Sequence, residues 1–248
     1  MVSPAIDIRS LRVAYGETVV LDGIDVQVAP SEIAIVVGGS GCGKSSLLKT
    51  VIGLVQPDAG QIEVLGQDSA LLDEQARAAL NKRLGVMFQY GALLNSLTIG
   101  QNIALPLEMH SDLEPALIAD IVRTRLGLVG LDNVYDRYPN ELSGGMRKRA
   151  ALSRAMVMDP EILLCDEPGA GLDPVTAAEI DELLLTINRE LGTTIVIVTH
   201  ELLSIERLDG RLIMLDQGQV IFTGSVSLAK RSHHPVVHPF FHPGGPPT

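Results

Sequence analysis

Hydrophobic and polar residues alternate over residues 6–28, near the start of the chain. A period of two is typical of strands with one buried face, so the segments IDIRSLRV and VVLDGIDVQV predict two antiparallel strands separated by a turn at Gly16. Residues 32–37 are different, because they form a continuous apolar run, rich in Ile and Val, that stops at a cluster of glycines. Such a run is typical of a strand buried on both faces in a parallel sheet.

Similar apolar runs alternate with helix-like segments along the rest of the chain. The predicted strands span residues 85–88, 162–165, 194–198 and 212–215, and the predicted helices span residues 44–54, 143–158, 174–191 and 201–208. This alternation predicts an α/β layer architecture with its ligand chemistry at the carboxyl ends of the strands. The stretch from about residue 97 to residue 158 has no strand run, which predicts a helical lobe inserted at about residues 90–160.

The composition changes at about Ser225, and the chain ends in RSHHPVVHPFFHPGGPPT. The dense X-Pro steps predict that residues 225–248 form a flexible, extended tail rich in Pro and His, with Phe240 and Phe241 available to anchor it on a neighbouring surface. A metal-binding tract is the alternative interpretation of its four histidines. No internal repeat is evident, so each chain is expected to carry one site.

The net charge limits the kinds of partner that the chain can bind, and its cysteines indicate the redox state of its compartment. The formal net charge is −11 and the basic residues are dispersed, so the chain lacks the electrostatic footprint of nucleic-acid binding, and no nucleic acid is expected as a partner. Cys42 and Cys165 lie far apart without metal-ligand spacing, which favours a reduced cytosolic setting. No leader pattern and no apolar run of membrane-spanning length are present, so we expect a chain that is neither exported nor membrane-spanning.

The first predicted buried strand ends in GGSGCGKSS, which matches the phosphate-binding pattern G-x-x-x-x-G-K-[ST]. Glycines let such a loop fold tightly and point its backbone amides at a phosphate. Lys44 would neutralise the β- and γ-phosphates, and Ser45 would ligate Mg²⁺. The predicted nucleotide-binding residues of this loop are Gly38, Gly39, Ser40, Gly41, Cys42, Gly43, Lys44, Ser45 and Ser46. Kinases, GTPases and helicases share this loop, so by itself it indicates only phosphate binding.

Two further motifs follow in the chain. The apolar strand ILLC runs into Asp166 and Glu167, where one carboxylate can hold the Mg²⁺ shell and the next can polarise an attacking water. A solvated turn before a proline is the alternative interpretation of this pair. Upstream, Ser143, Gly144 and Gly145 begin a predicted helix, where a hydroxyl and two unhindered amides form an anion site. Ser143 as a plain helix N-cap is the alternative there.

The segment LSGGM at residues 142–146 resembles the signature sequence of ABC ATPases, which usually ends in Gln. The resemblance extends over residues 6–224: Tyr15 matches an aromatic residue that stacks on adenine, Gln89 matches the glutamine between the two lobes, and His200 matches the switch histidine. AGLDP at residues 170–174 resembles the dimer-contacting loop. The resemblance implies a P-loop NTPase (RecA-like) core with an N-terminal antiparallel β-subdomain and an inserted α-helical signature lobe, together making one ABC ATPase domain over residues 1–224. Taken singly, Tyr15, Gln89 and His200 would each fit a structural role.

The mechanism that the resemblance implies is a head-to-tail homodimer with ATP held between the P-loop of one chain and the signature of the other. Glu167, His200 and Lys44 would then be the catalytic residues. Ser45, Gln89 and Asp166 would hold Mg²⁺, and Ser143, Gly144 and Gly145 would complete the nucleotide site of the second chain.

Within that family, the doubled glycine of GGSGCGKSS, residues 85–110 and LSGGMRKRAALSRAM resemble the ATPases of Mla-type phospholipid and Mce-type lipid transport. This implies a peripheral motor on the cytoplasmic side of the inner membrane, with an integral membrane permease and an Mce-type lipid-binding subunit as partners. Leu93, Leu94, Leu97 and Ile99 are expected either to dock the permease or to pack internally. The alternatives are an importer ATPase for another small substrate, a non-transport ABC protein of translation or DNA repair, and a small-molecule P-loop kinase.

Overall fold

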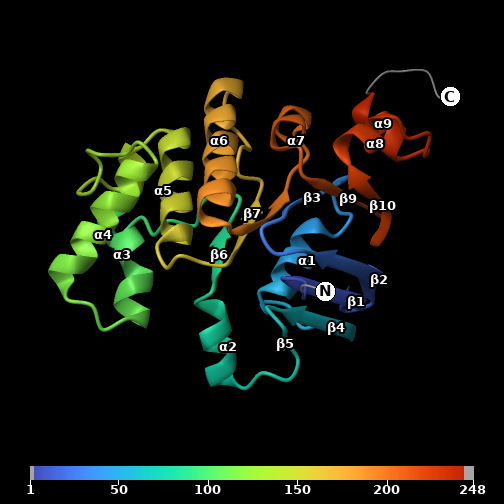
Figure 1. The fold of residues 1–248 in the computed structure, drawn as a ribbon, viewed down its shortest axis with the longest axis horizontal. Coiled ribbons are helices and arrows are strands. Elements are labelled where there is room, and N and C mark those ends of the chain that lie inside the picture. The colour runs from blue at the N-terminus through green and yellow to red at the C-terminus, as the bar shows by residue number, and fades with distance from the viewer. Residues whose placement is uncertain (1–2, 243–248) are drawn as a thin grey trace.

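The computed structural model describes residues 3–242, and over these residues the strands form two sheets (Figure 1). The first is antiparallel, has the order β2-β1-β4-β5, and consists of β1 (Ile6–Tyr15), β2 (Thr18–Val28), β4 (Ala59–Val64) and β5 (Gln67–Asp68). The second has the order β10-β9-β3-β8-β7-β6 and consists of β3 (Ile33–Gly38), β6 (Leu84–Met87), β7 (Ile162–Asp166), β8 (Thr194–Val198), β9 (Arg211–Asp216) and β10 (Gln219–Ser225). Its strands are parallel except for β10, which pairs antiparallel to β9.

The parallel sheet is buried on both faces, as its apolar runs predict. Every residue of β8 is buried, and in β3 the side chains alternate between two core clusters. Val36 packs with the antiparallel sheet and with the helix that follows β3, whereas Ile35 and Val37 pack with helices on the opposite face. The strand predictions are therefore confirmed, and both faces of the sheet are covered by other elements.

Helices cover the sheet and build the inserted lobe. Those around the sheet are α1 (Lys44–Val51), α2 (Glu74–Asn81), α6 (Pro174–Leu191) and α7 (Leu202–Leu208). The lobe between β6 and β7 contains α3 (Ile99–His110), α4 (Pro115–Leu128), the 3-10 turn η1 (Pro139–Glu141) and α5 (Gly144–Met156). It has its own core, shown at the left of Figure 1, in which Ile99 is fully buried, so Ile99 packs internally and is not available for docking. The first predicted helix, residues 44–54, ends early, at Val51.

The prediction of an extended tail is wrong for residues 226–230 and 237–241. They form two short helices, α8 (Val226–Lys230) and α9 (Val237–Phe241), which pack against each other and on the core beside α7 and β9. The physical reason is that Val237 and Phe241, four residues apart, lie on the same face of α9 and are both buried. Lys230 also forms an ion pair of 2.5 Å with Glu206 of α7. Residues 243–248 of the expected tail lie outside the described residues.

The described residues contain neither a cluster of three His, Cys, Asp or Glu side chains that could hold a metal ion nor a membrane-spanning helix. Within residues 3–242, no three His, Cys, Asp or Glu side chains gather at a point where they would hold a metal ion. Each helix in that range is too short or too polar to cross a bilayer.

Candidate functional site

Four of the predicted segments follow four neighbouring strands of the parallel sheet. In the spatial order β3-β8-β7-β6, the strands lead into the phosphate loop, His200, the pair Asp166 and Glu167, and Gln89. Because these strands are parallel, their carboxyl ends lie at the same edge of the sheet. That edge is where ligands bind in open α/β sheets.

The phosphate loop needs glycine at its two ends. Gly38 and Gly43 have φ angles of 149° and 105°, which L-residues rarely adopt. A Cβ on Gly38 would lie 2.2 Å from the carbonyl oxygen of Leu215, and one on Gly43 would lie 2.4 Å from Cδ2 of Leu21. Gly43 is the N-cap of α1 and supplies no side-chain cap, so the first amides of this helix remain available to an anion.

Lys44 folds back over its own loop. Its Nζ donates hydrogen bonds to the carbonyl oxygens of Gly38 at 2.9 Å and Gly39 at 2.8 Å, and lies 3.7 Å from Sγ of the buried Cys42. Tyr15, at the end of β1, is half-exposed and directs its hydroxyl toward Oγ of Ser46 at 3.4 Å. The structure therefore places a cation and an aromatic ring beside the phosphate loop.

Ser45 and Asp166 form an oxygen pair at the start of α1. The Ser45 hydroxyl donates to Oδ1 of Asp166 at 3.4 Å, and burial raises the pKa of Asp166 although this hydrogen bond opposes the shift. A hydroxyl and a carboxylate are hard oxygen ligands of the kind that Mg²⁺ prefers, so the donor set fits the predicted ion. Gln89 is exposed at the end of the adjoining strand β6.

Glu167 is buried, with a φ of 51°, directly after β7. One carboxylate oxygen, Oε1, lies 2.6 Å from Nδ1 of His200. In the described part of the chain the other oxygen, Oε2, is buried and has no hydrogen-bond partner. A buried polar atom without a partner destabilises the fold, and such atoms are often explained by a catalytic role or by a ligand.

The signature residues lie apart from this cluster. The Ser143 hydroxyl accepts a hydrogen bond of 3.3 Å from the Met146 amide, so it caps α5, as the alternative interpretation proposed. A Cβ on Gly145 would lie 2.4 Å from Cγ2 of Thr176, so the start of α5 packs closely on α6. Figure 1 shows β7 and α6 between α5 and α1. Ser143, Gly144 and Gly145 are therefore not brought together with the phosphate loop of their own chain.

Lys148 belongs to the neighbourhood of the site although its sequence context gave no sign of it. This residue of α5 is buried, and its Nζ donates to the carbonyl oxygens of Gln89 and Glu167. A lysine in a helix usually lies on a solvated face, so the sequence pattern did not single it out.

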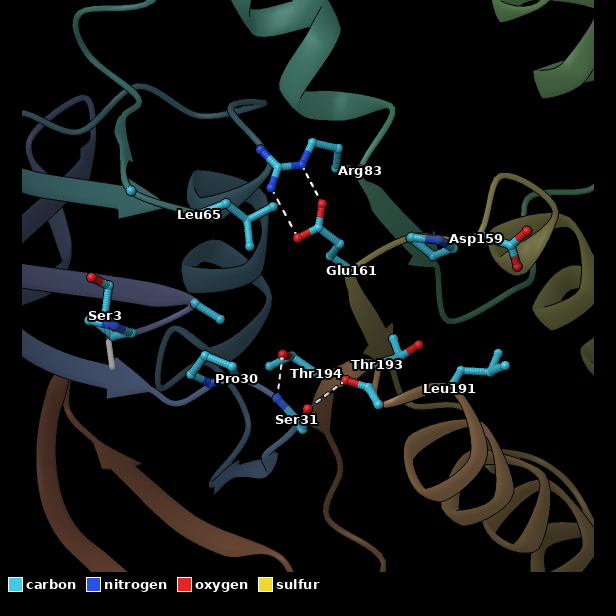
Figure 2. Close-up of a pocket in the computed structure, with 15 residues that line it drawn as sticks. Ser3, Pro30, Ser31, Leu65, Arg83, Asp159, Glu161, Leu191, Thr193 and Thr194 are labelled. Carbon is cyan, nitrogen blue, oxygen red and sulfur yellow. Dashed lines mark hydrogen bonds and ion pairs between the residues drawn. The ribbon is translucent and has the colours of Figure 1, made fainter. Parts of the chain in front are cut away.

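An open groove of about 640 Å³ lies at the opposite end of the strands (Figure 2). Its walls include Arg83, Glu161, Ser31 and Thr194, which lie at or just before the starts of β6, β7, β3 and β8. Figure 2 shows the Arg83–Glu161 ion pair on one side and the Ser31 amide donating to Oγ1 of Thr194 on the other. Because it lies at the amino ends of the strands, this groove is separate from the phosphate loop.

The sequence profile described as ABC transporter matches residues 21–170. The chain is 37% identical over 236 residues to the probable ribonucleotide transport ATP-binding protein mkl of Mycobacterium leprae, with 95% of this chain and 68% of the relative covered. It is 39% identical over 224 residues to the methionine import ATP-binding protein MetN of Brucella abortus, with 90% of this chain and 60% of the relative covered. The chain thus spans between 60% and 68% of the length of these relatives.

Among solved structures, the chain is similar to the ATP-binding cassette MJ0796 in a dimeric post-hydrolysis state bound to ADP and phosphate. The TM-score is 0.81 and the identity 27%, with 89% of this chain and 98% of that chain covered. The predicted P-loop NTPase architecture, with an antiparallel β-subdomain and a helical lobe, is confirmed by this similarity. The chain therefore belongs to the ABC transporter family, as an ATP-binding and ATP-hydrolysing cassette.

Proposed function

We propose that this cassette is the motor of a lipid transporter, moving phospholipid or another lipid through an Mla/Mce-type permease complex. The observation that carries the motor role is the gathering of the phosphate loop, Asp166, Glu167 and His200 at one sheet edge, with the signature on a separate lobe. A site divided in this way is completed by a second chain.

Each residue of the cluster has a proposed role in hydrolysis. Glu167 orients and deprotonates the attacking water, with Oε2 as the free oxygen, and His200 holds Oε1 and faces the transferred phosphate. Lys44 leaves the carbonyls of its own loop to neutralise charge on the phosphates. Mg²⁺, held by Ser45, Asp166 and Gln89, would supply charge neutralisation at the phosphate oxygens.

The dimer is part of the proposal. Ser143 is exposed at the start of α5, where its hydroxyl and the amides of Gly144 and Gly145 can reach a phosphate bound to another chain. The dimeric state of the cassette MJ0796 supports a homodimer. We propose that its chains lie head to tail with two ATP molecules between them. ATP then favours the closed dimer because it contacts both chains. Loss of the γ-phosphate removes this shared contact and lets the dimer open.

Lipid is the proposed cargo because the phosphate loop, residues 85–110 and the signature helix resemble Mla- and Mce-type ATPases. The relatives mkl and MetN carry the names of ribonucleotide and methionine transport, so an importer ATPase for another small substrate is the second candidate. In either case we place the chain peripherally on the cytoplasmic side of the inner membrane, against an integral permease.

The permease is expected to dock on the segment that follows Gln89. Tyr90 is 90% exposed and Leu94 is 45% exposed, so this loop presents two large apolar side chains to a partner. Leu94→Glu should abolish capture of the permease in a pull-down. The matched control is Leu128→Glu at the end of α4, which is 65% exposed and should leave capture unchanged. Undiminished capture by the Leu94 variant would count against docking there.

Affinity purification of the chain from its native membranes in mild detergent tests the cargo. Recovery of a multi-span permease with an Mce-type subunit and phospholipid, identified by mass spectrometry, is the expected result. A permease with a different soluble binding protein would keep the motor and change the cargo. Ribosomes, or no membrane partner, would refute the transporter role.

A further inference from the structure

Lys148 links two segments of the site that are far apart in sequence. It is 7% exposed, and its Nζ donates both to the carbonyl oxygen of Gln89 and, at 2.9 Å, to that of Glu167. Gln89 follows β6 and Glu167 follows β7, while Lys148 itself lies in the first turns of α5. A buried ammonium group is tolerated only where acceptors replace water, and these two carbonyls provide them.

The hydrogen bond from Lys148 to Glu167 reaches a backbone conformation that needs stabilising contacts. A φ of 51° is uncommon for a non-glycine residue and is stable only when the surroundings hold it. The Glu167 amide donates to the Val198 carbonyl at 2.9 Å, and the Glu167 carbonyl accepts from the Ala170 amide at 3.2 Å and from Lys148. Lys148 is the side chain among these three partners, so its removal leaves the peptide with backbone contacts alone.

The charge of Lys148 also suits its surroundings. Burial lowers its pKa, and the nearby acidic groups oppose that shift, with Glu167 the strongest of them and Glu201 and Asp166 further contributors. Three carboxylates thus lie near enough to favour the charged form of this side chain. The ammonium group partly offsets their mutual repulsion at the edge where phosphate would bind.

We propose that Lys148 is a positioning residue for ATP hydrolysis, which fastens the Glu167 backbone and the Gln89 segment to the helix that begins with the signature. It holds the carboxylate of Glu167 in place relative to the phosphate loop. Because Lys148 contacts both segments, a shift of α5 moves the Glu167 backbone and the Gln89 segment together. The inference rests on the proposed roles of Glu167 and Gln89.

Lys148→Met removes the donors and the charge while keeping a side chain of similar shape. We expect kcat for ATP hydrolysis to fall by about 10- to 100-fold, as for a small misplacement of a catalytic group, while KM for ATP changes by less than about threefold. Lys148→Arg, which retains charge and donors, should recover at least about tenfold of the lost kcat. An ATP-binding stoichiometry equal to that of wild type, measured on the same samples, separates positioning from a general loss of folded protein, which would also lower the apparent kcat and leave KM unchanged.

The matched control is Arg154→Met in the same helix. Arg154 is partly buried and donates to the carbonyls of Gly91 at 2.9 Å and Ala92 at 2.7 Å, but its hydrogen bonds do not reach Glu167. Its variant should lower kcat by less than about threefold. An equal loss of kcat in both variants, unchanged kcat in Lys148→Met, or parallel changes in kcat and KM would each overturn the inference.

Two reference samples separate this inference from the proposed function. Suppose that the wild-type chain hydrolyses ATP and Glu167→Gln does not. A wild-type kcat in Lys148→Met would then refute the positioning role of Lys148 and leave the proposed role of Glu167 intact. If Glu167→Gln retains turnover, the proposed role of Glu167 fails, and the role of Lys148 fails with it.

Discussion

Glu167 and Gly43 show how single residues set the geometry of the site. Glu167 has a left-handed backbone, one carboxylate oxygen held by His200 and the other buried without a partner among the described residues. Gly43 occupies a position where both its φ angle and the neighbouring Leu21 exclude a side chain. Glu167 holds a conformation that is unfavourable for a non-glycine residue, which is common where a site must be organised before its ligand arrives, and Gly43 holds one that glycine adopts readily but other residues do not.

Gly43→Ala tests the steric requirement of the phosphate loop. The added Cβ would lie 2.4 Å from Cδ2 of Leu21 and 3.0 Å from the Val20 carbonyl oxygen, at a φ of 105°. We expect the free energy of unfolding, measured by urea denaturation, to fall by about 1–3 kcal/mol. Gly39→Ala in the same loop is the control, because a Cβ there meets nothing within 4 Å. Equal stability of the two variants would contradict this loop geometry.

At the scale of elements, ion pairing joins the starts of the neighbouring strands β6 and β7. Nε of Arg83 lies 2.5 Å from Oε1 of Glu161, and Nη2 lies 3.0 Å from Oε2. The Arg83 hydrogen bond lowers the pKa of Glu161 below its ordinary value of 4.5. A lowered pKa in the folded state means that the pair stabilises the fold above the unfolded pKa. That contribution is lost as the pH falls through the folded pKa.

Glu161→Gln should therefore reduce stability at pH 7 and lose its effect in acid. Both side chains are partly exposed, so the free energy of unfolding should fall by less than about 1 kcal/mol. The difference from wild type, measured by urea denaturation from pH 7 downward, should shrink once the pH drops below 4.5. A difference that stays constant over this range would show that the pair contributes nothing through its charge.

The C-terminal helix α9 is held by its buried face. Phe241 is 8% exposed and packs with the cluster that also contains Ile205 and Leu208 of α7. Truncating a buried Phe to Ala commonly costs about 3–5 kcal/mol, and we expect Phe241→Ala to lower Tm and the free energy of unfolding toward that range. Phe240→Ala, at a partly buried position on the same helix, should have a clearly smaller effect. Equal effects would argue against docking through Phe241.

These elements also show what the sequence reveals and what it hides. The strands β3, β7 and β8 are predictable because burial on both faces requires an uninterrupted apolar run. The helix α2 escaped prediction because Leu80 is its single buried residue, which leaves no apolar stripe. The helices α8 and α9 escaped it because each has five residues, too few for local propensity to decide, and their stability comes from tertiary packing.

At the scale of the whole molecule, the spatial order of the strands in the sheet differs from their order along the chain. The motifs occur along the chain after β3, β6, β7 and β8, but the sheet order β3-β8-β7-β6 places His200 between the phosphate loop and Glu167. The phosphate loop and the pair Asp166 and Glu167 were predictable from residue type and spacing, whereas Gln89 and His200 were expected only from the resemblance to ABC ATPases. The contact between Glu167 and His200 and the buried link through Lys148 depend on sheet order and helix packing, which no local pattern specifies.

The division of the molecule into a sheet edge and a separate signature lobe supports the proposal that one chain offers only part of the site. The phosphate loop is exposed at Gly39, Ser40 and Gly41, and the signature packs on α6, apart from this edge. Hydrolysis is therefore expected to require the second chain for phosphate contacts and Glu167 for the chemistry.

The central claim is that Glu167 is the catalytic carboxylate of ATP hydrolysis. Phosphate release by Glu167→Gln, compared with wild type at saturating ATP and Mg²⁺, tests this claim most directly. The amide keeps the shape of the carboxylate but cannot take a proton, so we expect release to fall by at least about 10²-fold while ATP binding, measured on the same samples, is retained. The control is Glu190→Gln on the exposed end of α6, which should hydrolyse ATP like wild type. Phosphate release near the wild-type rate in Glu167→Gln would contradict the account.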